Sequence, residues 1–154
     1  MSATVGRRVV LAATTCVVAL ASAGPAASLT RLPGFRSPTG NIKCFFIPGS
    51  PGLLRCSIAH ADYARQLQAR CMAPNGAGVD WHGFELSPTR KGEVTCSGGI
   101  LYNPETQRPS YVSLPYGTTW RQGAFTCWSR TTGVSCRNRT GHGLFISRQA
   151  WRAW

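Results

Sequence analysis

The chain has 154 residues, with 17 lysines and arginines against 5 aspartates and glutamates, and a formal net charge of +12 at pH 7. This length corresponds to one domain that can bury a core of its own, which excludes a mini-protein held together by disulfides alone. The positive charge favours anionic partners over cationic ones, although a GC-rich genome, which enriches arginine, explains the same composition.

The first residues are typical of a targeting segment rather than of a folded element. Residues 7–8 (Arg-Arg) form a basic region, residues 9–20 form an apolar run, and residues 21–23 (Ala-Ser-Ala) match a small-residue cleavage site. We therefore expect a signal peptide over 1–23, a flexible segment over 24–34, and a mature chain that is secreted or associated with the cell envelope. An uncleaved anchor is the alternative. The apolar run is shorter than the about 20 residues that span a bilayer, so we expect no stable transmembrane span in the mature chain.

The cysteine content fits an oxidising compartment. Cys16 lies in the apolar run, and its removal leaves an even number of cysteines, which indicates a disulfide framework in an exported chain. A metal site is the alternative, but the sequence has no C-x-x-C pair and no cysteine–histidine cluster at ligand spacing. We expect neither a metal ion nor another cofactor. The six remaining cysteines are Cys44, Cys56, Cys71, Cys96, Cys127 and Cys136.

Beyond the leader, turn-forming residues interrupt the chain every few positions. Glycine, proline, serine and threonine separate short apolar runs, a rhythm typical of all-β domains. We expect a single small disulfide-braced all-β domain of short antiparallel hairpins over 35–154. One short helix is predicted near 60–70, where Tyr63, Leu67 and Arg70 recur at helical spacing.

Three of the cysteines follow one five-residue pattern, which reads glycine, any residue, an apolar residue, any residue, cysteine. The pattern begins at Gly40, Gly92 and Gly123. Residues two apart on a strand share a face. The apolar residue and the cysteine are therefore predicted to point together into a core, behind a turn at the glycine.

The first hairpin has a register that brings two cysteines together. With Cys44 opposite Cys56, the apolar residues Ile42 and Ile58 also face each other. A slip of one residue would send the two sulfurs to opposite faces of the sheet. We therefore predict a disulfide between Cys44 and Cys56.

The last hairpin is predicted in the same way. With Cys127 opposite Cys136, residues 130–133 form a four-residue loop in which Gly133 supplies a positive φ. A three-residue loop over 131–133 would place the two sulfurs on opposite faces, so the cystine selects the longer loop.

The two remaining cysteines, Cys71 and Cys96, are then predicted to pair with each other. Six cysteines allow fifteen connectivities, so this sequential pairing rests on register alone. In the chain-entropy model, each closed loop stabilises the fold by about 3 kcal/mol.

The mature chain carries a series of short motifs in a specific order. They include FRSPTGNIKC from Phe35, LLRCSI from Leu53, LPYG from Leu114, GAFTC from Gly123 and GHGLFISR from Gly141. In order and spacing, these motifs resemble a family of small exported actinobacterial proteins with six cysteines, a domain of unknown function. The resemblance implies export and paired cysteines. It implies no activity, catalytic residue or ligand.

The last third of the chain has a one-sided charge. No acidic residue follows Glu105, whereas arginines and tryptophans recur up to the C-terminus. In the register above, Trp128 points away from the core, and an outward tryptophan beside arginines can stack on sugars or bases. The alternative is that Trp151 and Trp154 cover this face as a second small core. The candidate surface for an anionic ligand comprises Trp128, Arg130, Arg137, Arg139, His142 and Arg148.

Candidates for catalysis are few, and we assign no catalytic residue. The chain has three histidines, His60, His82 and His142, and a ribonuclease-like mechanism would need two of them to converge with a cation. The segment Asp80-Trp81-His82 is the densest cluster of polar chemistry, and the alternative is a turn residue, a packed aromatic and a solvated imidazole. Glycines on both sides of His142 indicate a tight turn, which either presents the ring or serves the backbone alone.

These observations predict a non-catalytic binding or interaction module of the cell envelope or extracellular space. Its partner would be an anionic cell-wall polymer, a nucleic acid or an acidic protein. The alternatives are a small secreted hydrolase, ribonuclease-like or active on the cell wall, and an inhibitor of another enzyme. Convergence of the histidines and acids in one cleft would favour the hydrolase, and their scatter would favour the module.

Overall fold

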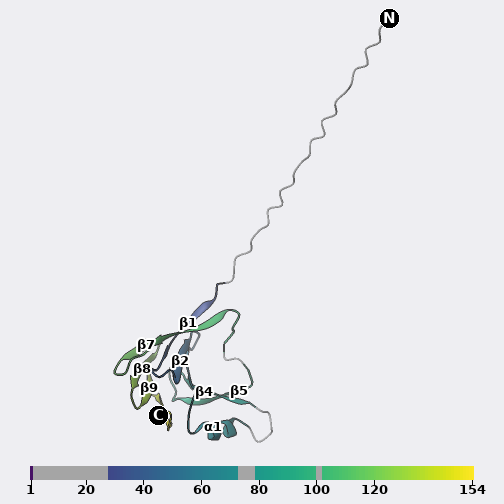
Figure 1. The fold of residues 1–154 in the computed structure, drawn as a ribbon. Coiled ribbons are helices and arrows are strands. Elements are labelled where there is room, and N and C mark those ends of the chain that lie inside the picture. Colours follow the sequence, from purple (N-terminus) through teal and green to yellow (C-terminus); the bar gives the residue numbers. More distant parts are fainter. Residues whose placement is uncertain (2–27, 73–78, 100–101) are drawn as a thin grey trace.

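A computed structural model describes residues 1, 28–72, 79–99 and 102–154 of the chain (Figure 1). Apart from Met1, the predicted signal peptide and its cleavage site lie outside the described residues, as does Cys16. The described residues form two β-sheets and one short helix, so the predicted all-β, disulfide-braced fold is confirmed.

The first sheet has six strands. It comprises β1 (Thr30–Arg36), β2 (Ile42–Ile47), β3 (Leu53–Ile58), β4 (Asp80–Leu86), β5 (Glu93–Ser97) and β6 (Gln107–Ser113). Their spatial order is β5-β4-β3-β2-β1-β6, and neighbours are antiparallel except for β1 and β6, which run parallel. The parallel pair lies outside the predicted hairpin scheme, because hairpin signals report only strands that are neighbours in the chain.

The second sheet has five strands, and each pairs with its neighbour in the chain. It comprises β7 (Thr119–Gln122), β8 (Phe125–Arg130), β9 (Gly133–Asn138), β10 (Gly143–Ile146) and β11 (Trp151–Ala153). All pairs are antiparallel, as expected for short connections. This sheet is therefore the simple series of hairpins that the turn residues indicate.

The N-terminal boundary of the domain differs from the prediction. β1 begins at Thr30, so residues 30–34, which belong to the predicted flexible segment 24–34, are part of a strand. Leu32 is fully buried, and β6 pairs with β1 along its whole length. The sequence signal was weak here because Pro33 and Gly34 are residues typical of loops.

The helix α1 (Ala64–Cys71) lies in the predicted region but begins four residues after His60. The residues before it are held by the opposite sheet, where the Asp62 N–H donates to the carbonyl of Arg148 at 2.9 Å. On the helix itself, Leu67 and Cys71 are buried. A four-residue spacing of this kind places both side chains on one face.

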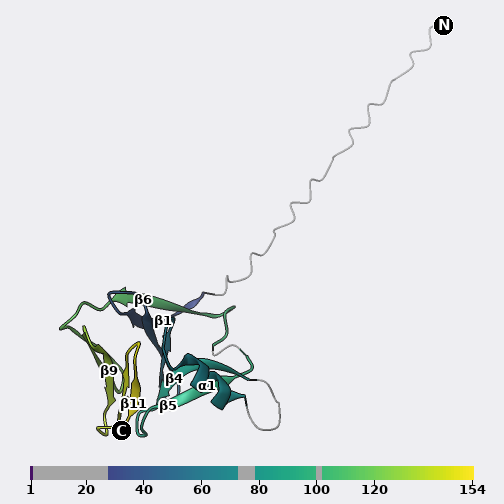
Figure 2. The same cartoon turned by 60° about the horizontal axis from the view of Figure 1, so that its bottom comes forward.

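The two sheets share one core. Figure 2 shows the six-stranded sheet curving from β6 and β1 round to β4 and β5, with β9 and β11 on its inner side. Aromatic rings meet across the layers: Phe84 of β4 lies 5.1 Å from Trp151 of β11, measured between ring centroids. Phe35 of β1 lies at the same distance from Trp120 of β7.

Two of the disulfides join the strands of a hairpin, with the predicted register. Cys44 lies opposite Cys56, and Cys127 lies opposite Cys136. Both cystines are buried between the sheets. They also pack together, because the sulfurs of Cys44, Cys56 and Cys136 all lie within 4.8 Å of one another.

The turn of the last hairpin is shorter than predicted. Arg130 pairs with Gly133, which leaves Thr131 and Thr132 as a two-residue loop. The predicted four-residue loop has the same register, because extending both strands by one residue changes no cross-strand partner. Gly133 has the expected positive φ, 142°.

The third disulfide joins Cys71 of α1 to Cys96 of β5, as predicted. The expected burial of Cys96 is wrong. Cys71 is buried, but Cys96 is exposed, because β5 is an edge strand and the bond leaves the sheet toward the helix. Gly92 also has a different role from a turn: a Cβ there would lie 2.9 Å from the Cβ of Leu144, so this glycine lets the two sheets approach.

Candidate functional site

The candidate site is the face of the five-stranded sheet that points away from the core. Phe125, Cys127 and Ser129 of β8 are buried, so the intervening residues of that strand point outward. Cross-strand register extends this face over the whole sheet. We define the outer face by its charged and aromatic residues, Arg121, Trp128, Arg130, Arg137, Phe145, Arg152 and Trp154.

A shallow hollow of about 270 Å³ lies on this outer face. Trp128 and Trp154 border it together with Arg130 and Arg137. The Trp154 indole N–H donates to the carbonyl of Gly141 at 3.1 Å, which fixes the ring beside the sheet. The structure therefore brings together three of the predicted surface residues and adds Trp154 to them.

The sheet register does not place Trp151 and Trp154 together over the outer face, as a second small core would require. Trp151 lies opposite Ile146, a buried residue, so its ring packs into the shared core against Phe84. Trp154 is on the outer face and remains 43% exposed. Trp128 is therefore half-buried beside Trp154 rather than covered by both tryptophans.

The electrostatics of the outer face are uniformly positive. Four of its residues are arginines, and none of the strand residues β7–β11 is acidic. Within the described residues, the two ion pairs are Arg55–Glu85 and Arg148–Asp62, neither of which lies on this face. One arginine has an aromatic partner, since the Arg152 guanidinium lies 5.1 Å from the centroid of the Phe145 ring.

The other three predicted surface residues lie elsewhere. Arg139 borders a separate hollow together with Phe46. His142 lies in the turn between β9 and β10, where its carbonyl accepts the N–H of Asn138 at 2.9 Å. Arg148 lies between β10 and β11 and pairs with Asp62. These three residues lie off the outer face because they belong to connections between strands, where strand alternation no longer applies.

Arg121, Phe145 and Arg152 were not assigned to this face from the sequence, and Trp154 was considered there only as part of a covering core. Alternation within β10 places Phe145 between the buried Leu144 and Ile146, a signal that the sequence contains. The order of strands in the sheet determines which strands lie beside β10. These residues could therefore be grouped on one face only once the sheet topology was known.

A pocket of about 510 Å³ lies at the seam between the two sheets, and we call it the interlayer pocket. One wall comes from the β1–β2 loop and His60. The other wall comes from the β8–β9 turn and the β10–β11 loop, which contribute Arg130 and Arg148. Arg130 is therefore shared between this pocket and the hollow on the outer face.

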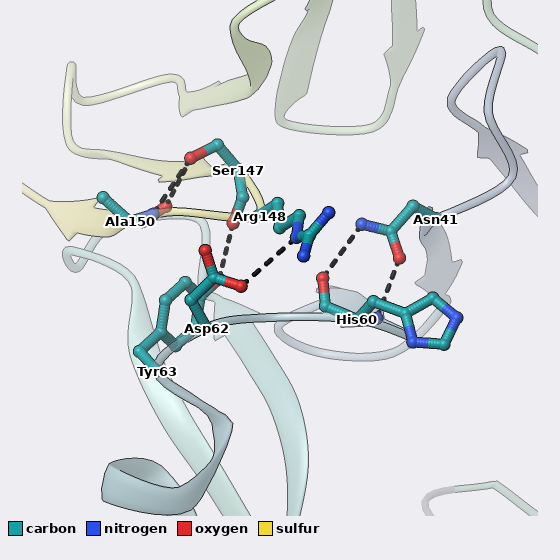
Figure 3. A network of polar contacts seen from close by, with 7 residues as sticks. All are labelled: Asn41, His60, Asp62, Tyr63, Ser147, Arg148 and Ala150. Atoms are coloured by element: carbon teal, nitrogen blue, oxygen red, sulfur yellow. Dashed lines mark hydrogen bonds and ion pairs between the residues drawn. The ribbon is translucent and has the colours of Figure 1, made fainter.

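Polar contacts hold the two walls of the interlayer pocket (Figure 3). The Asn41 side chain accepts the His60 N–H at 2.8 Å and donates to the His60 carbonyl at 3.1 Å. The Tyr63 hydroxyl donates to the carbonyl of Ser147 at 3.0 Å, which joins the segment before α1 to the opposite sheet. These bonds fix loops that would otherwise have to be ordered by a ligand.

Burial raises the pKa of Tyr63 to about 12 from its ordinary value of 10.0. The folded state therefore keeps the phenol protonated at pH values where the unfolded state loses the proton. A folded pKa that is raised gives stability that is present below pH 10 and is lost as the pH rises toward 12.

We predict that Tyr63→Phe costs about 0.5–1.5 kcal/mol at neutral pH, since one hydrogen bond is lost. The same variant should lose less stability than the wild type on going to alkaline pH. Urea unfolding at several alkaline pH values measures both effects. Tyr116→Phe is the matched control, because Tyr116 is 45% exposed and should change neither quantity. An unchanged alkaline loss in Tyr63→Phe would contradict the assignment.

The three histidines lie at different places. His60 borders the interlayer pocket, and His142 lies in the β9–β10 turn. His82 borders another hollow, of about 490 Å³, together with Asp80. Trp81 between them points inward, with its ring 5.7 Å from that of Phe84, so the interpretation of a packed aromatic is confirmed.

Among the described residues, no helix is both long and apolar enough to traverse a bilayer. Comparison with protein families matches residues 12–152 to the model of a family of unknown function (DUF6636). No curated protein and no solved structure matches the chain.

Proposed function

We propose that this chain, which belongs to the DUF6636 family of unknown function, is an exported, non-catalytic binding module. Its ligand would be an anionic polymer of the cell envelope, bound on the outer face of the five-stranded sheet. The observation that carries the proposal is the acid-free group of arginines around the hollow between Trp128 and Trp154.

The spacing of the arginines favours a polymer over a single ion. Arg121 and Arg137 both flank Thr126, one on each neighbouring strand. Two strand spacings separate their Cα atoms by about 10 Å. Charges repeated along a polymer can contact all the arginines of the outer face at once, whereas one small anion contacts at most those whose side chains converge on it.

The tryptophans favour a ligand with flat or ring-shaped units. Trp128 and Trp154 border the same hollow, and aromatic faces stack on sugar rings and bases. A polymer of sugars with phosphate or carboxylate groups would engage both the rings and the arginines. Nucleic acid has the same two features, so the binding experiment must compare them.

Two further observations support export and a binding role. Three disulfides fit an oxidising compartment. A ribonuclease-like mechanism would need two histidines to converge with a cation, and the three histidines of this chain lie at separate places. His82 shares its hollow with Asp80 but with no second histidine, so a ribonuclease-like hydrolase is the less supported function.

The direct test changes Arg121, Arg130 and Arg137 to Gln together. Affinity for an anionic wall polymer such as teichoic acid should fall at least about tenfold, because each lost guanidinium removes a charge-assisted hydrogen bond. The slope of log affinity against log salt should fall by about 2 to 3, because fewer counterions are released. Trp128→Ala should add a loss of about 1–3 kcal/mol in binding and only a small loss in melting temperature.

The matched control changes Arg31, Arg65 and Arg108 to Gln, since all three are exposed and lie outside the five-stranded sheet. It removes the same total charge and should keep most of the affinity. Equal losses in the two triple variants would mean that net charge alone drives binding, and would overturn the proposed site. Tighter binding of nucleic acid than of the wall polymer at matched salt would replace the ligand class.

A further inference from the structure

The interlayer pocket has a chemistry of its own. Its lining contains Arg130 and Arg148, and no aspartate or glutamate. Two guanidinium groups at one pocket favour an oxyanion, which accepts paired hydrogen bonds from each. The charge around this pocket therefore fits an anionic group rather than a neutral or cationic one.

Asp62 neutralises Arg148 only in part. The Asp62 carboxylate accepts from the Arg148 Nε at 3.2 Å, which leaves the two terminal nitrogens of the guanidinium without that partner. Figure 3 shows the guanidinium pointing toward the segment held by Asn41 and His60. Both side chains of the pair are more than half exposed, so the pair itself is weak and can share Arg148 with a ligand.

The remaining lining suits a hydroxylated body. The lining includes three exposed residues that carry hydroxyl groups, Thr131, Thr132 and Tyr116, and two buried apolar residues, Ile42 and Val134. A volume of about 510 Å³ accommodates a ligand of the size of one or two sugar units. Groups that can contact an oxyanion, hydroxyl groups and an apolar surface thus line the same open pocket.

We infer that the interlayer pocket binds a compact oxyanion on a hydroxylated body, namely a phosphorylated or carboxylated sugar or polyol. The site stands apart from the outer face, although Arg130 borders both. The pocket is formed before binding, because the Asn41–His60 and Tyr63–Ser147 contacts already fix its walls.

The test titrates the oxidised protein with glycerol 3-phosphate and with glucuronate, and with glycerol and glucose as neutral counterparts. Saturable binding is expected for at least one charged probe, with at least tenfold weaker binding of its neutral counterpart. Arg148→Gln should weaken the charged probe about tenfold, whereas Arg65→Gln on the exposed face of α1 should leave it within twofold. The probe that binds tighter identifies phosphate or carboxylate as the recognised group.

Two further variants make the outcome decisive. The double change Asp62→Asn with Arg148→Gln should show the same loss as Arg148→Gln, which excludes repulsion by a freed carboxylate as its cause. The double change Arg121→Gln with Arg137→Gln should weaken polymer binding and leave the small probes unaffected, so the two sites fail separately. Absence of saturable binding by both charged probes, or binding that Arg148→Gln leaves unchanged, would overturn the inference.

Discussion

Replacing Asn138 with Asp is expected to destabilise the protein by about 3 kcal/mol or more, although the two side chains have the same shape. Asn138 is 4% exposed, and its amide nitrogen donates to the carbonyls of Ser87 and Arg90, both at 2.9 Å. Its amide oxygen accepts from the N–H and the hydroxyl of Thr140. A carboxylate keeps the second pair of bonds but sets an oxygen without a hydrogen against two carbonyl oxygens, and buries a charge.

Urea unfolding measures this loss, which should shrink at acidic pH, where a protonated carboxyl can donate to one of the two carbonyls. Asn103→Asp is the matched control, because Asn103 is exposed and uses only its side-chain oxygen, which accepts the N–H of Glu105. That change should stay within about 0.5 kcal/mol. A small effect at Asn138 would show that this residue does not hold the end of β9 to the loop after β4.

Phe84→Ala should cost about 3–5 kcal/mol, because it removes a fully buried ring from the junction of the two sheets. The Phe84 ring lies 5.1 Å from that of Trp151, 5.7 Å from that of Trp81 and 6.4 Å from that of Tyr63. These neighbours come from both sheets and from the segment before α1. The cavity left by alanine would therefore loosen contacts between all three.

The control for this prediction is Phe145→Ala, the same chemical change on the outer face. Phe145 is half-buried and packs mainly on its own sheet, so its loss should cost less than half as much. Thermal or urea unfolding of both variants gives the comparison. Equal losses would mean that the shared core does not depend on the contacts of Phe84.

Hairpin register was predictable from sequence because side chains alternate with a period of two, and a disulfide tolerates no slip. Cys44 therefore had to lie opposite Cys56, and Cys127 opposite Cys136. The parallel pairing of β1 with β6 was not predictable in this way, because it joins segments far apart in the chain. The prediction that Cys96 is buried was wrong for a related reason, since a strand pattern does not show which strand lies at the edge of the sheet.

Prediction of the candidate site had the same limit. Alternation within β8 and β9 placed Trp128 and Arg137 outward, and the structure agrees. The addition of Arg152 and Trp154 depends on β11 lying beside β10, which only the topology shows. Asn138 was within reach of sequence reasoning, because it lies two residues beyond the buried Cys136 and so shares its face.

The consecutive pairing of the cysteines bears on how the chain acquires its disulfides. The six cysteines in the described part of the chain pair in consecutive twos, at separations of 12, 25 and 9 residues. Cysteines that become available in order along the chain meet these partners first. In the folded domain, the sulfur of Cys136 also lies within 4.8 Å of both Cys44 and Cys56. A reduced Cys136 is therefore close enough to attack the Cys44–Cys56 bond by thiol–disulfide exchange, with its own thiolate as the nucleophile and one of those cysteines as the leaving thiolate.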